Sequence, residues 1–227
     1  YDPRAQKIAR SMVEILNAAG VDWAVLGKRE KCTGDAARRA GNEYLFFQLA
    51  TENVETLNQV APKAIVTTCP HCFHTIGNEY KDFGGQYRVV HHSEFIAELL
   101  QSGRLQVSEE TKRVVFHDPC YLGRHNGVYD PPRDVLKGVG FRLVEPPRNR
   151  EGSFCCGAGG AQFWKEEEPG AMRVSENRYR ELKDTGAEVI ATGCPFCMAM
   201  MNVEVAQDEK PPEVLDIAEL VARGLKA

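Results

Sequence analysis

Long apolar runs are missing from this 227-residue sequence, and so is any strong excess of charge of one sign. No stretch approaches the ~20 apolar residues that cross a bilayer, and the first residues show neither a signal-peptide nor a transit-peptide pattern. Lysine and arginine number 28 against 32 aspartate and glutamate, which gives a formal net charge of -4. Nucleic acid is therefore not expected as a partner, because it selects strongly basic surfaces.

A disulfide framework of the kind found in small secreted domains is also not expected. The chain holds eight cysteines, but it is long, shows no export signal and spaces several of them as C-x2-C pairs. In a reducing cytosol such pairs are more often metal or redox sites than disulfides. The cysteines therefore predict metal or redox chemistry.

The motifs of the first half of the chain recur in the second half at a nearly constant offset. Residues 64–72, AIVTTCPHC, match residues 189–197, VIATGCPFC, at an offset of 125. Cys32 stands 124 residues before Cys156. Separate matches at nearly one offset indicate an internal repeat.

We therefore expect two tandem repeats related by a pseudo-twofold axis, residues 1–104 and residues 105–227. The first repeat has no counterpart of the strand and cysteine at residues 114–120. The natural protein is accordingly expected to extend upstream of this sequence.

Short β-branched runs alternate with helical segments in both repeats, which predicts an α/β fold of short parallel sheets flanked by helices. In the first repeat we expect helices at 4–19, 36–58 and 93–100, and strands at 21–26, 64–66 and 89–90. In the second we expect strands at 114–116, 141–144 and 189–191, and helices at 132–137, 172–184 and from 195 onward. Every cysteine clump follows a strand, so the clumps are expected at the carboxyl ends of the strands, where such sheets bind ligands.

The pair Cys194 and Cys197 has the spacing of two ligands on one helix face. Pro195 between them suits the first position of a helix, which puts Cys194 at the N-cap and Cys197 at the third helical position. The amino end of a helix also stabilises thiolates. Cys69 and Cys72 repeat the same arrangement around a proline.

Three further thiols belong with the second pair, namely Cys120, Cys155 and Cys156. The last two are followed by Gly157, Gly159 and Gly160, a run that lets the backbone approach a bulky group closely. Five thiols exceed the four ligands that satisfy one zinc ion. Iron–sulfur clusters and zinc are both consistent with a thiolate-rich site, and five thiols favour the cluster.

The pattern Cys120-x34-Cys155-Cys156-x37-Cys194-x2-Cys197 resembles the cysteine-rich CCG domain. That domain occurs in the catalytic subunit of heterodisulfide reductase and in the iron–sulfur subunit of glycolate oxidase. The resemblance implies that these five cysteines bind a [4Fe-4S] cluster, in its cubane or its noncubane form. The first set departs from the pattern, because Thr33 stands where the second cysteine would be. The remaining set, Cys32, Cys69 and Cys72, is expected to hold a second iron–sulfur cluster or zinc.

The stretch that starts at Cys32, CTGDAARRAGNE, is most similar to iron–sulfur oxidoreductases associated with electron-transferring flavoprotein. This resemblance implies an electron-transferring flavoprotein or another redox subunit as partner, and ferredoxin-like and membrane segments upstream in the same natural protein. It also implies a cytoplasmic location, at the cytoplasmic face of the membrane in the full-length protein.

Three functions remain open from the sequence. The first is an electron-transfer module that relays electrons between a flavoprotein and a quinone or disulfide acceptor. The second is a thiol–disulfide reductase acting at the cluster, so that catalysis by the chain itself stays open. The third is a zinc-stabilised structural or interaction domain without redox activity. His71 and His74 are alternative fourth ligands beside the first pair, and His117 is either a proton donor near the second set or a packed core histidine.

Overall fold

The computed structural model describes residues 3–166 and 169–226. In the first half of the chain the helices are α1 (Pro3–Ala18), α2 (Asp35–Arg39), α3 (Glu43–Val60), α4 (Pro70–Gly77) and α5 (His92–Gln101). In the second half they are α6 (Asp130–Gly138), α7 (Val174–Lys183), α8 (Pro195–Val205) and α9 (Ile217–Arg223). Short 3-10 turns are η1 (Gly27–Arg29), η2 (Glu79–Phe83), η3 (Arg150–Gly152) and η4 (Gln162–Trp164).

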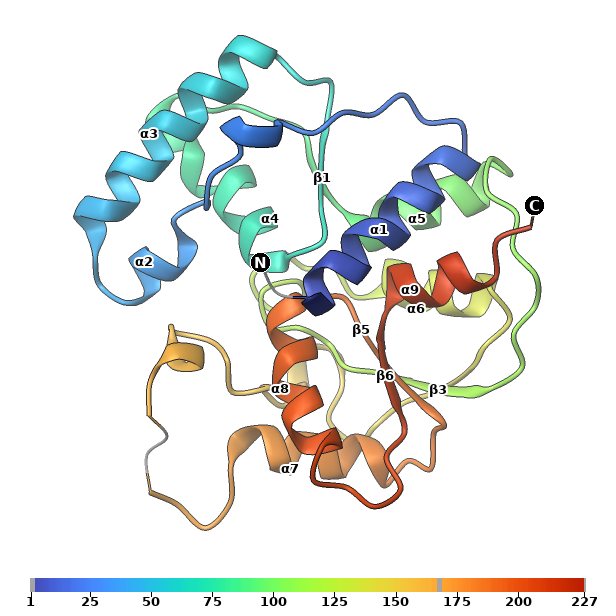
Figure 1. Ribbon diagram of the computed structural model, residues 1–227. Coiled ribbons are helices and arrows are strands. Elements are labelled where there is room, and N and C mark those ends of the chain that lie inside the picture. Colours follow the sequence, from blue (N-terminus) through green and yellow to red (C-terminus); the bar gives the residue numbers. More distant parts are fainter. Residues whose placement is uncertain (1–2, 167–168, 227) are drawn as a thin grey trace.

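Two parallel sheets lie among these helices (Figure 1). The smaller sheet pairs β1 (Ile65–Thr67) with β2 (Val89–His91). The larger sheet has the order β4-β3-β5-β6, formed by β3 (Arg113–Phe116), β4 (Arg142–Val144), β5 (Val189–Thr192) and β6 (Glu213–Asp216). All of these pairings are parallel, which confirms the predicted α/β class.

Helices cover both faces of the larger sheet, and alternate residues of β3 pack into two different apolar clusters. Val114 and Phe116 of β3 pack into an apolar cluster with side chains of α1, α5, α6 and α9. Val115, between them, packs on the other face with side chains of α7 and α8. Figure 1 shows α7 and α8 on the side of the sheet away from α1 and α9. Covering both faces with helices explains why the two central strands, β3 and β5, are apolar except at Arg113 and Thr192 at their ends.

The two halves of the chain share the first of these cores. Helix α1 packs against α9, and α5 packs against α6. A separate smaller core, with Phe46 and Tyr80 at its centre, lies between α3, α4 and η2. The division into two tandem repeats, residues 1–104 and 105–227, stays a prediction, and the two halves are joined through this shared apolar cluster.

The strand predicted at residues 21–26 is wrong, because this segment is irregular up to η1. Its place in the chain corresponds to that of β4 in the second half, and β4 pairs with β3. The described part of the first half offers no strand equivalent to β3 beside the segment. An isolated strand has no ladder of backbone hydrogen bonds, so its β-branched residues alone do not hold it extended.

The single helix predicted at residues 36–58 is also wrong, because the structure divides it into α2 and α3. Gly41 has a φ of 86°, a left-handed conformation that ends α2. The side chain of Asn42 then accepts a hydrogen bond from the backbone N–H of Leu45 at 3.0 Å and caps α3. Strand β6 was missed altogether, although Val214 and Leu215 stand 125 residues after the predicted strand at residues 89–90.

Candidate metal centre

The loops that carry Cys69, Cys120 and Cys194 each begin where a parallel strand ends, whereas Cys32 follows no strand, contrary to the expectation for every cysteine clump. Cys69 follows β1 and is the N-cap of α4, and Cys194 follows β5 and is the N-cap of α8. Each is followed by a proline in the first turn of its helix, as predicted. Cys120 follows β3, which lies next to β5 in the sheet. Because the strands are parallel, their carboxyl ends meet at one edge and the loops converge there.

The five thiols of the second set form a chain of contacts at that edge. The sulfur of Cys197 lies 3.3 Å from that of Cys156. The thiol of Cys155 interacts with those of both Cys120 and Cys156, and the thiol of Cys194 with that of Cys197. The backbone N–H of Gly157 donates to the sulfur of Cys155 at 3.3 Å, and Gly157 has the left-handed φ of 90° predicted for this glycine-rich run. All five predicted thiols are therefore brought together.

Hydrogen bonds among these thiols change their acidity in opposite directions. Hydrogen bonds from Cys120 and Cys156 lower the pKa of the Cys155 thiol. The bond to Cys155 raises the pKa of Cys156 to about 12. Burial raises the pKa of Cys194, but hydrogen bonds from Cys197 and Cys69 outweigh burial and lower it to about 6. Thiolates are the form that binds metals, and the array therefore favours ionised sulfur at Cys155 and Cys194.

The first set is not separate from the second. Cys69 is hydrogen-bonded to Cys194 of the second set as well as to Cys72 of its own. The hydroxyl of Thr33, at the position of the missing cysteine, lies 3.6 Å from the sulfur of Cys72. Cys32 is exposed, and its sulfur accepts a hydrogen bond from the backbone N–H of Gly34 at 3.5 Å. Seven of the eight thiols thus form one continuous row across the two halves of the chain.

This row differs from the ligand set of a single ion. Four thiolates around one zinc ion lie about 3.8 Å apart, as tetrahedral geometry and a Zn–S bond of about 2.3 Å require. Among the described residues, the metal-binding atoms that all lie within 4.8 Å of one another are those of His117, Cys156 and Cys197. The other sulfurs lie along the row, an arrangement that suits several metal atoms better than one.

A buried ion pair holds the loop that carries Cys120. Arg133 of α6 donates to both carboxylate oxygens of Asp118, at 2.7 and 2.9 Å, and is 2% exposed. Asp118 also accepts the backbone N–H of Arg150 at 2.9 Å, and its carbonyl accepts the hydroxyl of Ser153 at 3.1 Å. Asp118 therefore ties the Cys120 loop to the segment that leads into Cys155. The sequence shows only Asp-Pro-Cys here and does not reveal the partner fifteen residues away.

The side chain of His71, one of the two histidines predicted as a fourth ligand beside the first pair, is buried. Its Nδ1 lies 2.9 Å from a carboxylate oxygen of Asp35, and its ring stacks on that of Tyr121 at 4.0 Å between centroids. Because Tyr121 follows Cys120 and His71 lies between Cys69 and Cys72, this stack joins the two cysteine sets. Sequence reasoning assigned no role to Asp35 or Tyr121, although Asp35 lies in the stretch CTGDAARRAGNE that starts at Cys32.

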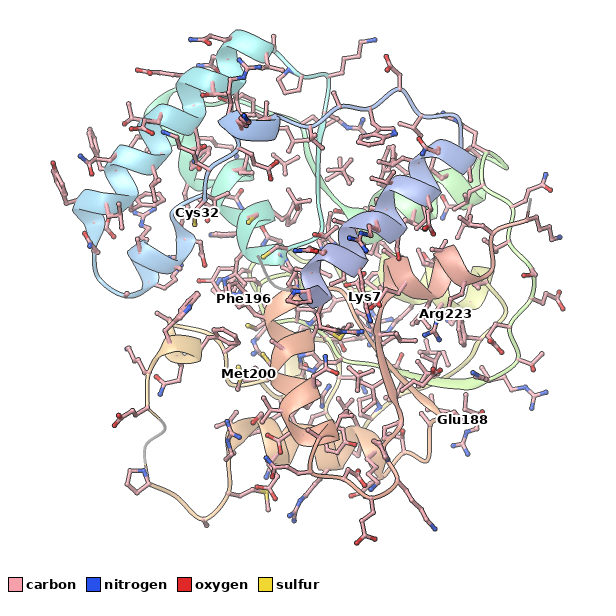
Figure 2. The ribbon with its side chains drawn as sticks, in the orientation of Figure 1. Lys7, Cys32, Glu188, Phe196, Met200 and Arg223 are labelled. Atoms are coloured by element: carbon pink, nitrogen blue, oxygen red, sulfur yellow. The ribbon has the colours of Figure 1, made fainter. Side chains whose placement is uncertain are left out.

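Aromatic side chains lie beside the sulfur row on the surface. Phe196, which Figure 2 labels at the start of α8, contacts His71 edge-on at 5.1 Å between ring centroids. Phe163 and Trp164 pack on Phe196 and are 40% and 58% exposed. This exposure excludes complete burial of Phe163 and Trp164 in a core.

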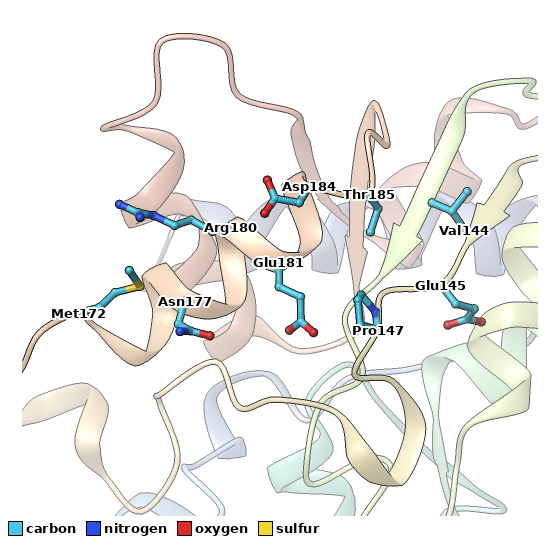
Figure 3. A pocket seen from close by; sticks show the side chains of 9 residues that line it. All are labelled: Val144, Glu145, Pro147, Met172, Asn177, Arg180, Glu181, Asp184 and Thr185. Carbon is cyan, nitrogen blue, oxygen red and sulfur yellow. The ribbon is translucent and has the colours of Figure 1, made fainter.

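A hollow of about 500 Å³ lies elsewhere, between α7 and the loop after β4 (Figure 3). Its lining includes Glu145, Asn177, Arg180 and Glu181 and no cysteine. Glu181 is the residue that links this hollow to the centre, since its carboxylate accepts from buried Arg178 at 2.8 Å.

A parallel α/β fold with paired thiols at its strand ends defines a cysteine-rich redox or metal protein. The family model described as "Cysteine-rich domain" (CCG) matches residues 1–77 and 114–202. The chain therefore belongs to the CCG cysteine-rich domain family, and the resemblance predicted from the cysteine pattern is confirmed.

Curated relatives cover the whole of this chain. EtfAB:quinone oxidoreductase of Syntrophomonas wolfei is 40% identical over 235 residues, which are 100% of this chain and 33% of that protein. The probable iron-sulfur-binding oxidoreductase FadF of Bacillus subtilis is 44% identical over 229 residues, 99% of this chain and 32% of that protein. One subunit of the dihydromethanophenazine:CoB--CoM heterodisulfide reductase of Methanosarcina barkeri is 34% identical over 236 residues, 99% of this chain and 56% of that protein. The chain thus spans about a third of the first two relatives and about half of the third.

Solved structures add little to this relationship. A putative Asp/Glu racemase from Yersinia pestis covers 96% of the chain at 15% identity with a TM-score of 0.35, which establishes no shared fold. Among the described residues, no helix combines the length and apolarity needed to cross a membrane.

Proposed function

We propose that this chain is an iron–sulfur electron-transfer module of a heterodisulfide-reductase-like oxidoreductase. The observation that carries the proposal is the row of thiols at the carboxyl ends of parallel strands. In the proposal, one [4Fe-4S] cluster is held by Cys120, Cys155, Cys156, Cys194 and Cys197. A bound cluster supplies reversible one-electron storage, and the protein supplies the thiolates and the surroundings that set its potential.

The donor set fits a cluster in two respects. Its five sulfurs are spread along a row instead of surrounding one point, so they reach more than one metal atom. Cys156, Cys194 and Cys197 are buried, which keeps water from that side of the site. Five thiols exceed the four that a cubane cluster needs, which favours the noncubane form. The zinc-stabilised domain is the weaker alternative, because a single ion leaves at least one of the five thiols unused.

The first set, Cys32, Cys69 and Cys72, is proposed to hold a second iron–sulfur cluster or zinc together with one further ligand. The contact between Cys69 and Cys194 supports a role for this set in passing electrons to or from the second one. Short separation between redox centres is what such a relay requires.

The partner is proposed to be an electron-transferring flavoprotein or another redox subunit, and the acceptor a quinone or a disulfide. Relatives named EtfAB:quinone oxidoreductase and heterodisulfide reductase support this assignment. A related protein named as a probable membrane-anchored ferredoxin supports ferredoxin-like and membrane segments in the natural protein. The module is proposed to lie at the cytoplasmic face of the membrane. Disulfide reduction at the centre is the second candidate function, favoured by the 34% identity to the Methanosarcina barkeri heterodisulfide reductase.

Metal and sulfide analysis of anaerobically purified protein tests the proposal. We expect brown protein with about four irons and matching acid-labile sulfide for the second set, and an EPR signal on one-electron oxidation or reduction. Zinc without labile sulfide, found under the same anaerobic conditions, would establish the structural domain instead. Rapid reduction by a flavoprotein combined with no turnover of disulfides would favour relay over disulfide reduction.

The fifth thiol gives a sharper prediction. Cys156→Ser leaves four thiols in the second set, enough for a cubane cluster. We expect the variant to keep most of its iron and to lose the EPR signal of the wild-type protein in favour of a cubane one. An unchanged spectrum would show that Cys156 is not a ligand, and Cys32→Ser, which removes an exposed thiol of the other set, is the matched control.

A further inference from the structure

His117 is a buried histidine beside the second cysteine set. It follows β3 directly and stands three residues before Cys120. Its backbone N–H donates to the carbonyl of Ala191 at 2.9 Å, which continues the pairing of β3 with β5 and fixes the ring's position. Its side chain is 1% exposed, so any hydrogen bond it makes is with the interior of the protein.

Arg178 decides which ring nitrogen carries the proton. Its Nε donates to Nδ1 of His117 at 3.0 Å, within the interior. A guanidinium has donors only, so Nδ1 must be the acceptor. An imidazolium carries hydrogen on both ring nitrogens, so a ring whose Nδ1 accepts a hydrogen bond is neutral. In a neutral imidazole whose Nδ1 accepts, the proton is on Nε2.

Arg178 is itself held in place. Its Nη1 donates to the carbonyl of Arg148 at 2.9 Å and to the carboxylate of Glu181 at 2.8 Å. Figure 3 shows Glu181 on α7 where that helix borders the hollow. The guanidinium cannot rotate away from His117 without breaking these bonds, so the tautomer is fixed by the fold.

Nε2 of His117 is buried and has no hydrogen-bond partner among the described residues. A ring nitrogen of His117 lies within 4.8 Å of the sulfurs of both Cys156 and Cys197. Nδ1 accepts from Arg178, so Nε2 is the ring nitrogen that remains free to donate to sulfur. A buried N–H without an acceptor is costly, and anionic sulfur at this position removes that cost.

We infer that His117 donates a hydrogen bond from Nε2 to sulfur of the bound cluster or of its thiolate ligands, and that Arg178 holds it in that tautomer. This inference rests on the proposed function. His117 is thus a positioning residue that tunes the cluster and not a metal ligand, because a protonated Nε2 has no lone pair to offer. A hydrogen bond to sulfur favours the reduced, more negative state and therefore raises the reduction potential.

The reduction potential of iron-loaded variants tests the inference. His117→Leu removes the donor and should lower the equilibrium constant for one-electron reduction about tenfold, or about 59 mV, with iron content unchanged. His117→Gln places an amide N–H near the former Nε2 and should recover most of the shift. His125→Leu is the control, because His125 is exposed and is expected to leave the potential unchanged.

ENDOR on protein labelled with ¹⁵N-histidine separates a hydrogen bond from ligation. We expect an exchangeable proton coupled to the cluster in the wild type, absent in His117→Leu, and only weak nitrogen coupling. Strong nitrogen coupling of a directly bound imidazole would overturn the inference. Iron-loaded His117→Leu with the wild-type potential would overturn it too while leaving the cluster intact, whereas wild-type protein without iron would overturn the proposed function first.

Discussion

Replacing Cys194 by alanine should lower the iron content of the second cysteine set further than Cys156→Ser does, because Cys194 also contacts Cys69 of the first set, and it should weaken metal binding at that set too. Cys194 is 1% exposed, and its thiol contacts both Cys197 and Cys69. Cys194 therefore belongs to the second cysteine set and also contacts Cys69 of the first set. Substitution of residues that only support a metal ligand costs about 10–100-fold in affinity, and removal of a ligand should cost at least as much. Iron and labile sulfide per chain, counted after anaerobic purification, measure the effect.

Cys32→Ala is the matched control for this experiment, because it removes one thiol that is exposed and is not in the row. It should leave the iron of the second set unchanged. Circular dichroism of both variants shows whether the fold survives, so that loss of iron is not confused with unfolding. Retention of the full iron content by folded Cys194→Ala would contradict the proposed ligand set.

Local pattern in the sequence was sufficient to predict the elements that carry the thiols. The apolar runs before Cys69, Cys120 and Cys194 predicted strands, and the prolines after Cys69 and Cys194 predicted helix starts. Strand β5 and helix α8 illustrate this well, because both depend on short-range features, β-branched residues and a proline at the first helical turn. The convergence of the second set followed from one topological rule about parallel sheets.

Pairings between distant segments were not predictable. The contact of Cys69 with Cys194 joins residues 125 apart, and nothing near either residue specifies it. The prediction of a strand at residues 21–26 was wrong for the same reason, because a strand forms only when another strand pairs with it. Arg178 has the appearance of a surface residue on a polar helix, yet it is fully buried against His117. Only the packing of α7 on the sheet reveals its role.

The second large effect is expected on stability, from Arg133→Met. The guanidinium of Arg133 also makes two bonds to the carboxylate of Glu145, at 2.7 and 2.9 Å, besides its two to Asp118. Glu145 is 38% exposed and is solvated when its partner is lost, whereas Asp118 is 3% exposed and keeps an unpaired charge in the interior. Breaking a buried pair in this way costs about 3–5 kcal/mol. Denaturant unfolding of wild type and variant, both prepared anaerobically, measures the difference.

Two further variants separate the destabilisation caused by the unpaired buried charge from the destabilisation caused by lost packing. Arg88→Met breaks an ion pair with Glu98 whose side chains are 59% and 53% exposed, and it should cost less than about 1 kcal/mol. Arg133→Met combined with Asp118→Asn removes both charges, and it should recover part of the stability lost in the single variant, because no unpaired carboxylate then remains buried. A double variant no more stable than Arg133→Met would show that the arginine stabilises this loop through its packing on α6 and β3 instead of through its charge.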